Sequence, residues 1–182
     1  MTLMYENLDA NTRQFMLKEM ELDISKGELY ISTRLNQQGK DMYASLLNDA
    51  IQSHDDEWLA NELRRLDYMN AFENRTGKNG ISKQVRVPIN APDILAEGEF
   101  NRFYIRGLCL RALEENIPAV EVYRGKQVNQ PRPESEVLIG KSICANRLLN
   151  DLRASRGIEP ALNLPPGPNS GLTARLFKVD RP

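Results

Sequence analysis

The segment Leu164–Gly171, close to the end of this 182-residue chain, limits most strongly what the sequence can fold into. It reads Leu-Pro-Pro-Gly-Pro-Asn-Ser-Gly, and each proline removes a backbone hydrogen-bond donor and fixes φ. Neither a helix nor a central strand can run through it. The following residues, Leu172–Val179, alternate well enough to form one extended strand. We therefore predict an extended, Pro/Gly-rich C-terminal arm over residues 158–182, held in place by docking because free chain ends fray.

The composition is that of an ordinary soluble globule, with 41% apolar and 27% charged residues. A net charge of −1 argues against a general nucleic-acid coat and against a membrane-surface binder, since both need a basic field. No apolar run approaches the roughly 18 residues of a membrane span. The first residues lack the layout of a signal peptide. We therefore expect a protein that stays inside a cell or is assembled there, without a membrane as its partner. The net charge disfavours nucleic acid as a partner but leaves a local basic patch open.

Residues 1–70 are predicted to form helices. Asp9 or Asn11 can cap the first of them. Apolar residues between Met42 and Ile51 recur at helical spacing, which is the clearest amphipathic pattern in the chain. Asp55 is placed to cap a third helix. This part of the chain is expected to pack with the next part as one domain.

Residues 71–157 are predicted to form an α+β core, a small sheet with a central helix. The expected elements are a loop or hairpin tip at residues 72–80, a half-buried edge strand at 85–89, the central helix at about 99–115, a second strand at 119–124, an exposed extended segment at 131–136, and a last helix at 144–154 capped by Ser142. A strand–helix–strand order over Val85–Tyr123 favours a crossover with parallel pairing. Within the central helix, Gly107 would let another element approach closely.

No motif in the sequence predicts catalysis, a cofactor or a metal. His54 is the only histidine and precedes two aspartates. Three adjacent residues at a helix entry point in different directions, and the aspartates serve better as caps. Cys109 and Cys144 are read as buried thiols rather than as a bridge or metal pair. We therefore expect a non-enzymatic protein without catalytic, metal-binding or cofactor-binding residues.

Two proline-containing segments, Pro131–Glu136 and Leu164–Pro168, are either rigid connectors or extended ligands for a partner. The C-terminal strand is suited to pair with the sheet edge of another chain. The body is expected to stay folded without residues 157–182 but to lose assembly. In this reading three apolar side chains anchor the arm and Arg175 makes a charged contact. The candidate partner-binding residues are Arg132, Pro165, Pro166, Leu172, Arg175, Leu176 and Phe177.

A group of basic residues supports an alternative function, the binding of nucleic acid. Glu99, Arg102 and Arg106 fall at i, i+3 and i+7 on the central helix, and Arg124 and Lys126 follow on the next strand. Clustered basic groups are what a nucleic-acid reader needs. Ion pairs along the helix surface explain the same spacing without a ligand. A small nucleic-acid-binding or regulatory factor therefore remains the second reading.

Three strings of residues carry a resemblance: Glu97–Leu108, Pro131–Glu136 and Leu164–Leu172. In them the chain resembles a poorly characterised family of small proteins of tailed phages and prophages, encoded among head-assembly genes. The resemblance implies a structural protein of the virion, either a head–tail connector (adaptor) or a capsid-reinforcing protein. It implies assembly in the host cytoplasm, copies of the same chain as partners, and contacts with portal, capsid or tail proteins. No role for an individual residue follows from it.

Overall fold

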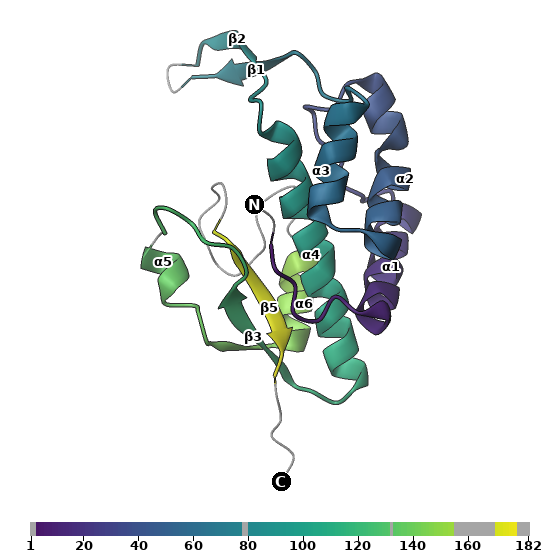
Figure 1. Ribbon diagram of the computed structural model, residues 1–182, viewed down its shortest axis with the longest axis vertical. Helices are drawn as coiled ribbons and strands as arrows, with labels where there is room; N and C mark the ends of the chain where they lie inside the picture. Colours follow the sequence, from purple (N-terminus) through teal and green to yellow (C-terminus); the bar gives the residue numbers. More distant parts are fainter. Residues whose placement is uncertain (1–2, 78–79, 132, 155–169, 178–182) are drawn as a thin grey trace.

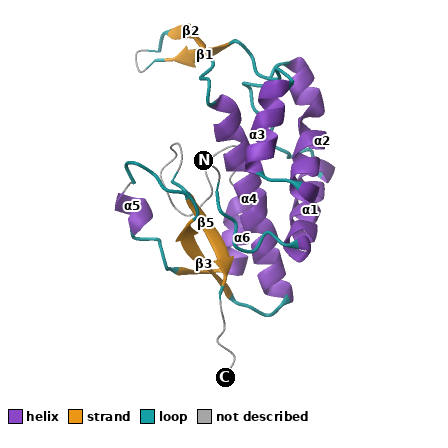
Figure 2. Cartoon of the chain, viewed as in Figure 1, coloured by secondary structure: helices purple, strands orange, loops and turns teal. Residues whose placement is uncertain are grey.

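The computed structural model describes residues 3–77, 80–131, 133–154 and 170–177. These residues form helices together with two small antiparallel sheets, which confirms the α+β class (Figures 1 and 2). The helices are α1 Ala10–Ser25, α2 Gln37–Ser53, α3 Asp56–Arg65, α4 Ala91–Glu114, α5 Pro133–Glu136 and α6 Ala145–Ala154. The strands are β1 Phe72–Thr76, β2 Ser82–Arg86, β3 Ala119–Arg124, β4 Ser142–Cys144 and β5 Leu172–Leu176.

The first three helices start at side-chain caps. The Asp9 carboxylate accepts a hydrogen bond from the Thr12 N–H at 2.9 Å, and Asp55 accepts one from the Trp58 N–H at 2.9 Å, as predicted. Asn36 caps α2 in the same way. The predicted apolar face of α2 is buried at Tyr43, Leu46, Leu47, Ala50 and Ile51, but Met42, where the pattern begins, is exposed. The helical reading of this part of the chain is therefore confirmed.

Helix α4 is the centre of the molecule. It lies between the N-terminal helices and the three-stranded sheet (Figure 1). It begins at Ala91, ahead of the predicted start at Glu99, because a proline such as Pro92 fits the first turn of a helix. A Cβ added at Gly107 would lie 2.7 Å from the Met16 backbone nitrogen of α1. The prediction that Gly107 allows a close approach is confirmed.

The two sheets are not joined. One has the strand order β4-β3-β5, and the other is the hairpin β1-β2; both are antiparallel. The predicted parallel crossover is therefore wrong, because β2 pairs with β1 and not with β3. Strand β2 also ends at Arg86, and its residues are mostly exposed rather than half-buried, since no layer covers it.

Three smaller expectations are corrected. Residues 133–136 form the short helix α5 instead of an extended segment, because Pro133 fits a first helical turn. Ser142 lies in β4, and α6 starts only at Ala145. Cys109 is buried as predicted, but Cys144 is exposed at the end of β4. Among the helices of the described ranges, none combines the length and the hydrophobicity that a membrane span requires.

Candidate interaction site

The predicted partner-binding residues occupy different environments. Arg132, Pro165 and Pro166 lie outside the described residues. Leu172 is 1% exposed and belongs to the hydrophobic core. Leu176 is half-buried against that core, whereas the Phe177 side chain is 43% exposed. Among the described candidates, Phe177 is thus the large apolar side chain that faces outward.

Strand β5 belongs to this chain's own sheet and is the last strand in the order β4-β3-β5. It pairs with β3 from Val120↔Leu176 to Arg124↔Leu172. On its other edge, the Asn101 side chain of α4 donates to the Leu172 carbonyl oxygen at 2.9 Å and accepts from the Thr173 hydroxyl at 2.7 Å. All of these groups are buried. The expectation that β5 pairs with the sheet edge of another chain is therefore corrected: β3 and α4 of the same chain enclose it.

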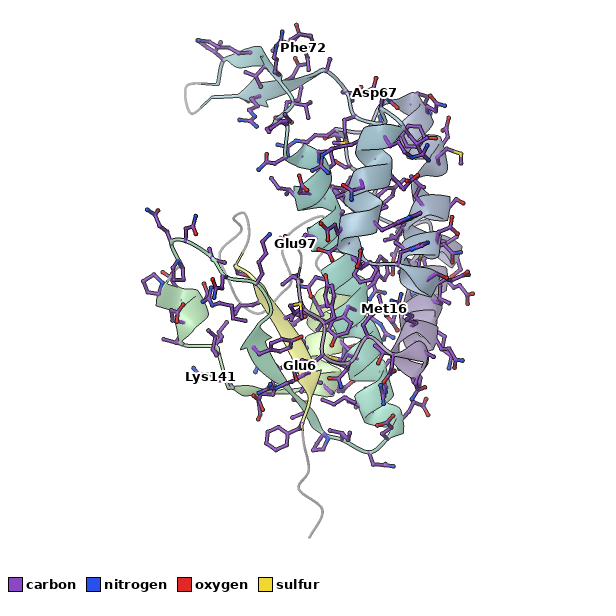
Figure 3. The ribbon with its side chains drawn as sticks, viewed as in Figure 1. Glu6, Met16, Asp67, Phe72, Glu97 and Lys141 are labelled. Atoms are coloured by element: carbon purple, nitrogen blue, oxygen red, sulfur yellow. The ribbon has the colours of Figure 1, made fainter. Side chains whose placement is uncertain are left out.

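Arg175 also makes its contacts within the chain. Its guanidinium forms ion pairs with Glu6, at 2.8 Å, and with Glu121, and lies 5.5 Å from the centre of the Tyr123 ring. Glu6 is labelled beside the sheet in Figure 3. The charged contact predicted for a partner is thus used to fasten β5 to the N-terminal residues.

The N-terminal segment, residues 3–7, also belongs to this site, although no sequence pattern predicted it. The Met4 N–H donates to the Gly125 carbonyl oxygen at 2.9 Å, and the Glu6 N–H donates to the Tyr123 hydroxyl at 2.9 Å. The Asn7 side-chain oxygen accepts from the Leu176 N–H at 2.9 Å. These hydrogen bonds join residues more than a hundred positions apart in the sequence, so no local sequence pattern could predict them. Both ends of the described chain are therefore tied to the same sheet.

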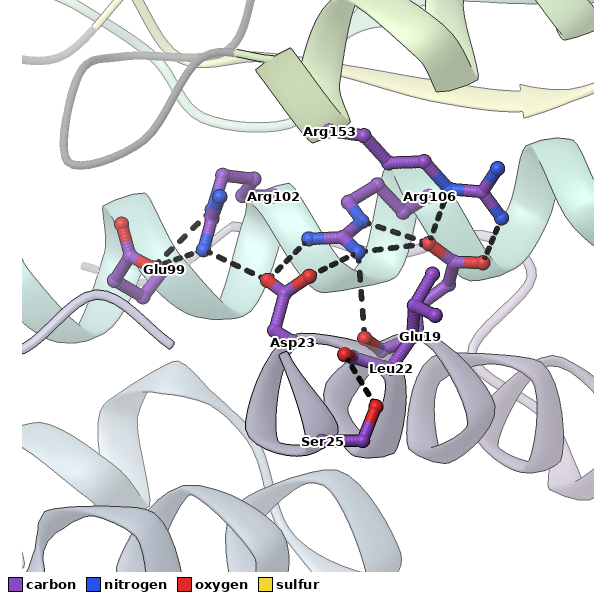
Figure 4. A network of polar contacts seen from close by, with 8 residues as sticks. All are labelled: Glu19, Leu22, Asp23, Ser25, Glu99, Arg102, Arg106 and Arg153. Atoms are coloured by element: carbon purple, nitrogen blue, oxygen red, sulfur yellow. Dashed lines mark hydrogen bonds and ion pairs between the residues drawn. The ribbon is translucent and has the colours of Figure 1, made fainter. Parts of the chain in front are cut away.

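A buried ion network joins three helices, and its members are the largest polar cluster in the described core (Figure 4). Arg106 of α4 binds Asp23 of α1 through both terminal nitrogens, at 2.6 and 2.8 Å, and binds Glu19 of α1 through Nε at 2.9 Å. Such bidentate guanidinium–carboxylate pairs are the strong ones. Arg102 pairs with Glu99 at 2.9 Å, and Arg153 of α6 pairs with Glu19. Three guanidinium groups therefore face three carboxylates, and the cluster is formally neutral.

Burial sets the electrostatics of this network. It raises the pKa of Glu99 above its ordinary value, against the attraction of Arg102. Burial would lower the pKa of Arg106, but the hydrogen bonds and charges of Asp23 and Glu19 outweigh it and raise that pKa. Arg106 is thus held in its charged form between two carboxylates. The network is built to hold α1, α4 and α6 together.

The basic residues of the alternative reading do not form one exposed face. Arg102 and Arg106 are fully buried in the network. Arg124 pairs with Glu136, and Lys126 pairs with Glu97. The predicted helical pair Glu99–Arg102 exists, but the partners of Arg106 come from α1. The signal missed in the sequence was Glu19 and Asp23, spaced i, i+4 beside the apolar Met16 and Met20.

The histidine and acidic residues near α3 have structural surroundings. The His54 ring stacks on Trp58 with ring centres 4.2 Å apart, and Asp55 is the helix cap. In the described part of the chain, no group of three or more His, Cys, Asp or Glu side chains is arranged to hold a metal ion. Comparison of this chain with protein-family models, with curated proteins and with solved structures gives no match.

Proposed function

We propose that this chain is a non-enzymatic structural protein of a tailed-phage virion, a head–tail connector or a capsid-reinforcing protein. The proposal rests first on the resemblance carried by Glu97–Leu108, Pro131–Glu136 and Leu164–Leu172. The partners it implies are copies of the same chain and portal, capsid or tail proteins. The place of action is the virion, after assembly in the host cytoplasm.

The observation that carries the proposal is the internal bracing of the body. Charged side chains from α1, α4 and α6 form ion pairs with one another in the interior of the body. Pairing with β3 fixes one edge of the last strand and Asn101 binds the other, while Arg175 links the strand to Glu6 and Glu121. A particle component must keep its shape while its neighbours bind, and a preorganised surface loses less entropy on binding. The structure of the body is consistent with that requirement.

In this proposal, the contact with a neighbouring subunit begins at Phe177. Its side chain is the first one beyond β5 and is 43% exposed, while the strand before it is anchored. A large aromatic side chain on a rigid support is the typical centre of a protein interface. In this proposal the arm contacts the neighbouring subunit from Phe177 onward. Strand β5 stays in the sheet of its own chain and anchors the arm.

The test is the mass of the purified protein in solution, compared with 20.7 kDa for one chain. We expect the wild-type chain to form a defined multiple of that mass and Phe177→Ala to shift it toward the monomer without changing the thermal unfolding curve. Phe72→Ala removes a similarly exposed phenylalanine from the hairpin, at 49% exposure, and serves as the control. A wild-type chain that remains monomeric at all concentrations, or a Phe72→Ala variant that dissociates equally, contradicts the proposal.

A further inference from the structure

The hairpin β1–β2 stands away from the rest of the molecule (Figures 1 and 3). Its two strands pair with each other, and no other described helix or strand packs closely on them. All of its strand residues are exposed except Glu73 and Val85, which are half-buried. An isolated two-stranded hairpin is only marginally stable in water. The molecule nevertheless presents both faces of this ribbon to solvent.

The base of the hairpin is firmly attached. Glu73 accepts a hydrogen bond from the Arg34 Nε at 2.6 Å, and the Val87 N–H donates to the Ala71 carbonyl oxygen at 3.0 Å. Asn70 donates to the carbonyl oxygens of Thr33 and Leu35 just before β1 begins. The ribbon is therefore a projection held in a fixed position at its root.

The hairpin carries an excess of positive over negative charge, unlike the rest of the chain. Between Phe72 and Arg86 the sequence has four cationic residues, Arg75, Lys78, Lys83 and Arg86, and one anionic residue, Glu73. The segment therefore carries +3, and since the whole chain carries −1, the remainder carries −4. A near-zero total thus conceals a basic hairpin on an acidic body.

The hairpin has too few carboxylates to neutralise its cationic side chains. Arg75 stands directly opposite Lys83, an arrangement of like charges that destabilises a strand pair. The one acid, Glu73, binds both Arg34 and Arg75. Lys83 and Arg86 have no ion pair with any described residue, and Arg86 lies over the Phe72 ring at 6.0 Å. An anionic partner would remove the repulsion that the fold leaves in place.

The remaining side chains indicate which anionic partner fits. Phe72 and Arg86 share a face with two opposed polar pairs, Asn74↔Gln84 and Thr76↔Ser82. Amides, hydroxyls and cations are the groups that contact phosphates, sugars and base edges. The core of a protein–protein interface is instead depleted in charge and rich in apolar side chains. A two-stranded ribbon also fits the major groove of B-form DNA, whereas the deep, narrow major groove of A-form RNA excludes it.

We infer that the β1–β2 hairpin binds double-stranded DNA through its phosphate backbone. Arg86 is the contact on the face of the polar pairs, and Arg75 and Lys83 are the contacts on the opposite face of the ribbon. The negative body keeps the rest of the surface away from the phosphates, so the hairpin approaches first. The net charge disfavours nucleic acid as a partner but leaves room for a local basic patch, and the hairpin is such a patch. It does not depend on the proposed virion role, which is tested through Phe177.

The test is fluorescence anisotropy of a labelled mixed-sequence DNA duplex titrated with the full chain at several salt concentrations. Binding should weaken as salt rises, with a log–log slope of about −3 for three phosphate contacts. The variant R75Q/K83Q/R86Q should lose most of this slope and bind weakly even at low salt. The control K40Q/K141Q/R147Q removes three exposed cations of the body and the same net charge, so it should bind like the wild type.

Three outcomes overturn the inference. One is the absence of wild-type binding at low salt. Another is an equal loss in both triple variants, which would mean a response to total charge. The third is a hairpin variant that changes the mass in solution but still binds DNA, which would make the ribbon a protein contact. Unfolding of each variant in urea, followed by circular dichroism, establishes that the body is intact.

Discussion

At the scale of single residues, a missing side chain sets the spacing of two helices. Gly107 of α4 faces α1, where an added Cβ would lie 2.7 Å from both the backbone nitrogen and the Cγ of Met16. Glycine inside a helix costs about 1 kcal/mol relative to alanine. Gly98, on the same helix, has nothing within 4 Å of the equivalent position. Substitution by alanine is therefore expected to destabilise the protein at Gly107 and to stabilise it at Gly98.

We predict that Gly107→Ala lowers the free energy of unfolding by about 1–3 kcal/mol, because the new methyl group overpacks the α1–α4 contact. Gly98→Ala should raise it by up to about 1 kcal/mol through helix propensity alone. Urea denaturation followed by circular dichroism measures both. Equal stabilisation by the two substitutions would mean that α1 and α4 are not in close contact at Gly107.

Individual residues also show what a sequence can and cannot reveal. The caps Asp9 and Asp55 act locally, and Gly107 is recognisable as a small residue inside a predicted helix, so each was predictable. The pair Glu99–Arg102 was predictable as well, since its members lie one turn apart. The burial of Arg106 was not, because Glu19 and Asp23 lie more than eighty positions away. Charged residues at helical spacing look the same on a surface and in a buried network.

At the scale of elements, the network fixes α1 and α6 to α4. We predict that Arg106→Met lowers the free energy of unfolding by about 3–5 kcal/mol, because Glu19 and Asp23 lose the buried guanidinium that they share, which leaves Glu19 with Arg153 and Asp23 with Arg102 at 3.6 Å. Arg65→Met removes an i, i+3 pair with Glu62 on the surface, where the arginine side chain is 66% exposed and water screens the charges, so the free energy of unfolding should change much less than in Arg106→Met. Both values come from urea denaturation. Similar losses in the two variants would contradict a structural role for the buried pairs.

The last strand gives a second test at this scale. Ending the chain after Ser170 removes β5, uncovers the β3 edge and leaves Asn101 without its buried partners. We predict that this variant loses its sharp unfolding transition and its near-ultraviolet circular dichroism and binds a hydrophobic dye, as partly folded states do. A chain ending after Phe177 keeps β5 and should unfold like the wild type. A cooperative transition in the shorter chain would restore the sequence-based view of an independently stable body.

Elements were predictable where they are long and locally patterned. Helix α2 shows its buried face in the spacing of its own residues. Strand β4 has three residues and α5 has four, so neither is long enough to display a period. The alternation in β3 and β5 indicated strands, but the partner of a strand is a long-range property. For that reason the predicted parallel pairing of β3 is wrong, and β5 pairs with β3 of the same chain instead of with another chain.

At the scale of the whole molecule, α4 connects the two halves of the chain. It contacts α1 and α3 on one side and α6 and β5 on the other (Figure 1). The ion network and the bonds of residues 4–7 to the sheet add further links between the halves. Under this arrangement neither half can open without uncovering α4. We therefore expect residues 1–70 and 71–157 to unfold as one cooperative unit.

Two probes placed by the chain itself can measure this. Trp58, the only tryptophan in the sequence, reports on α3. A fluorophore attached to the exposed thiol of Cys144 reports on β4. The label does not react with Cys109, because burial raises the pKa of that thiol and keeps it in its unreactive protonated form. Both signals should follow the same urea midpoint and slope, as in a two-state transition. A Cys144→Ser variant that takes up no label shows that Cys109 is not modified. Two separate midpoints would mean that α4 carries two independent cores, and the ion network between α1 and α6 would then be a contact between domains rather than the centre of one.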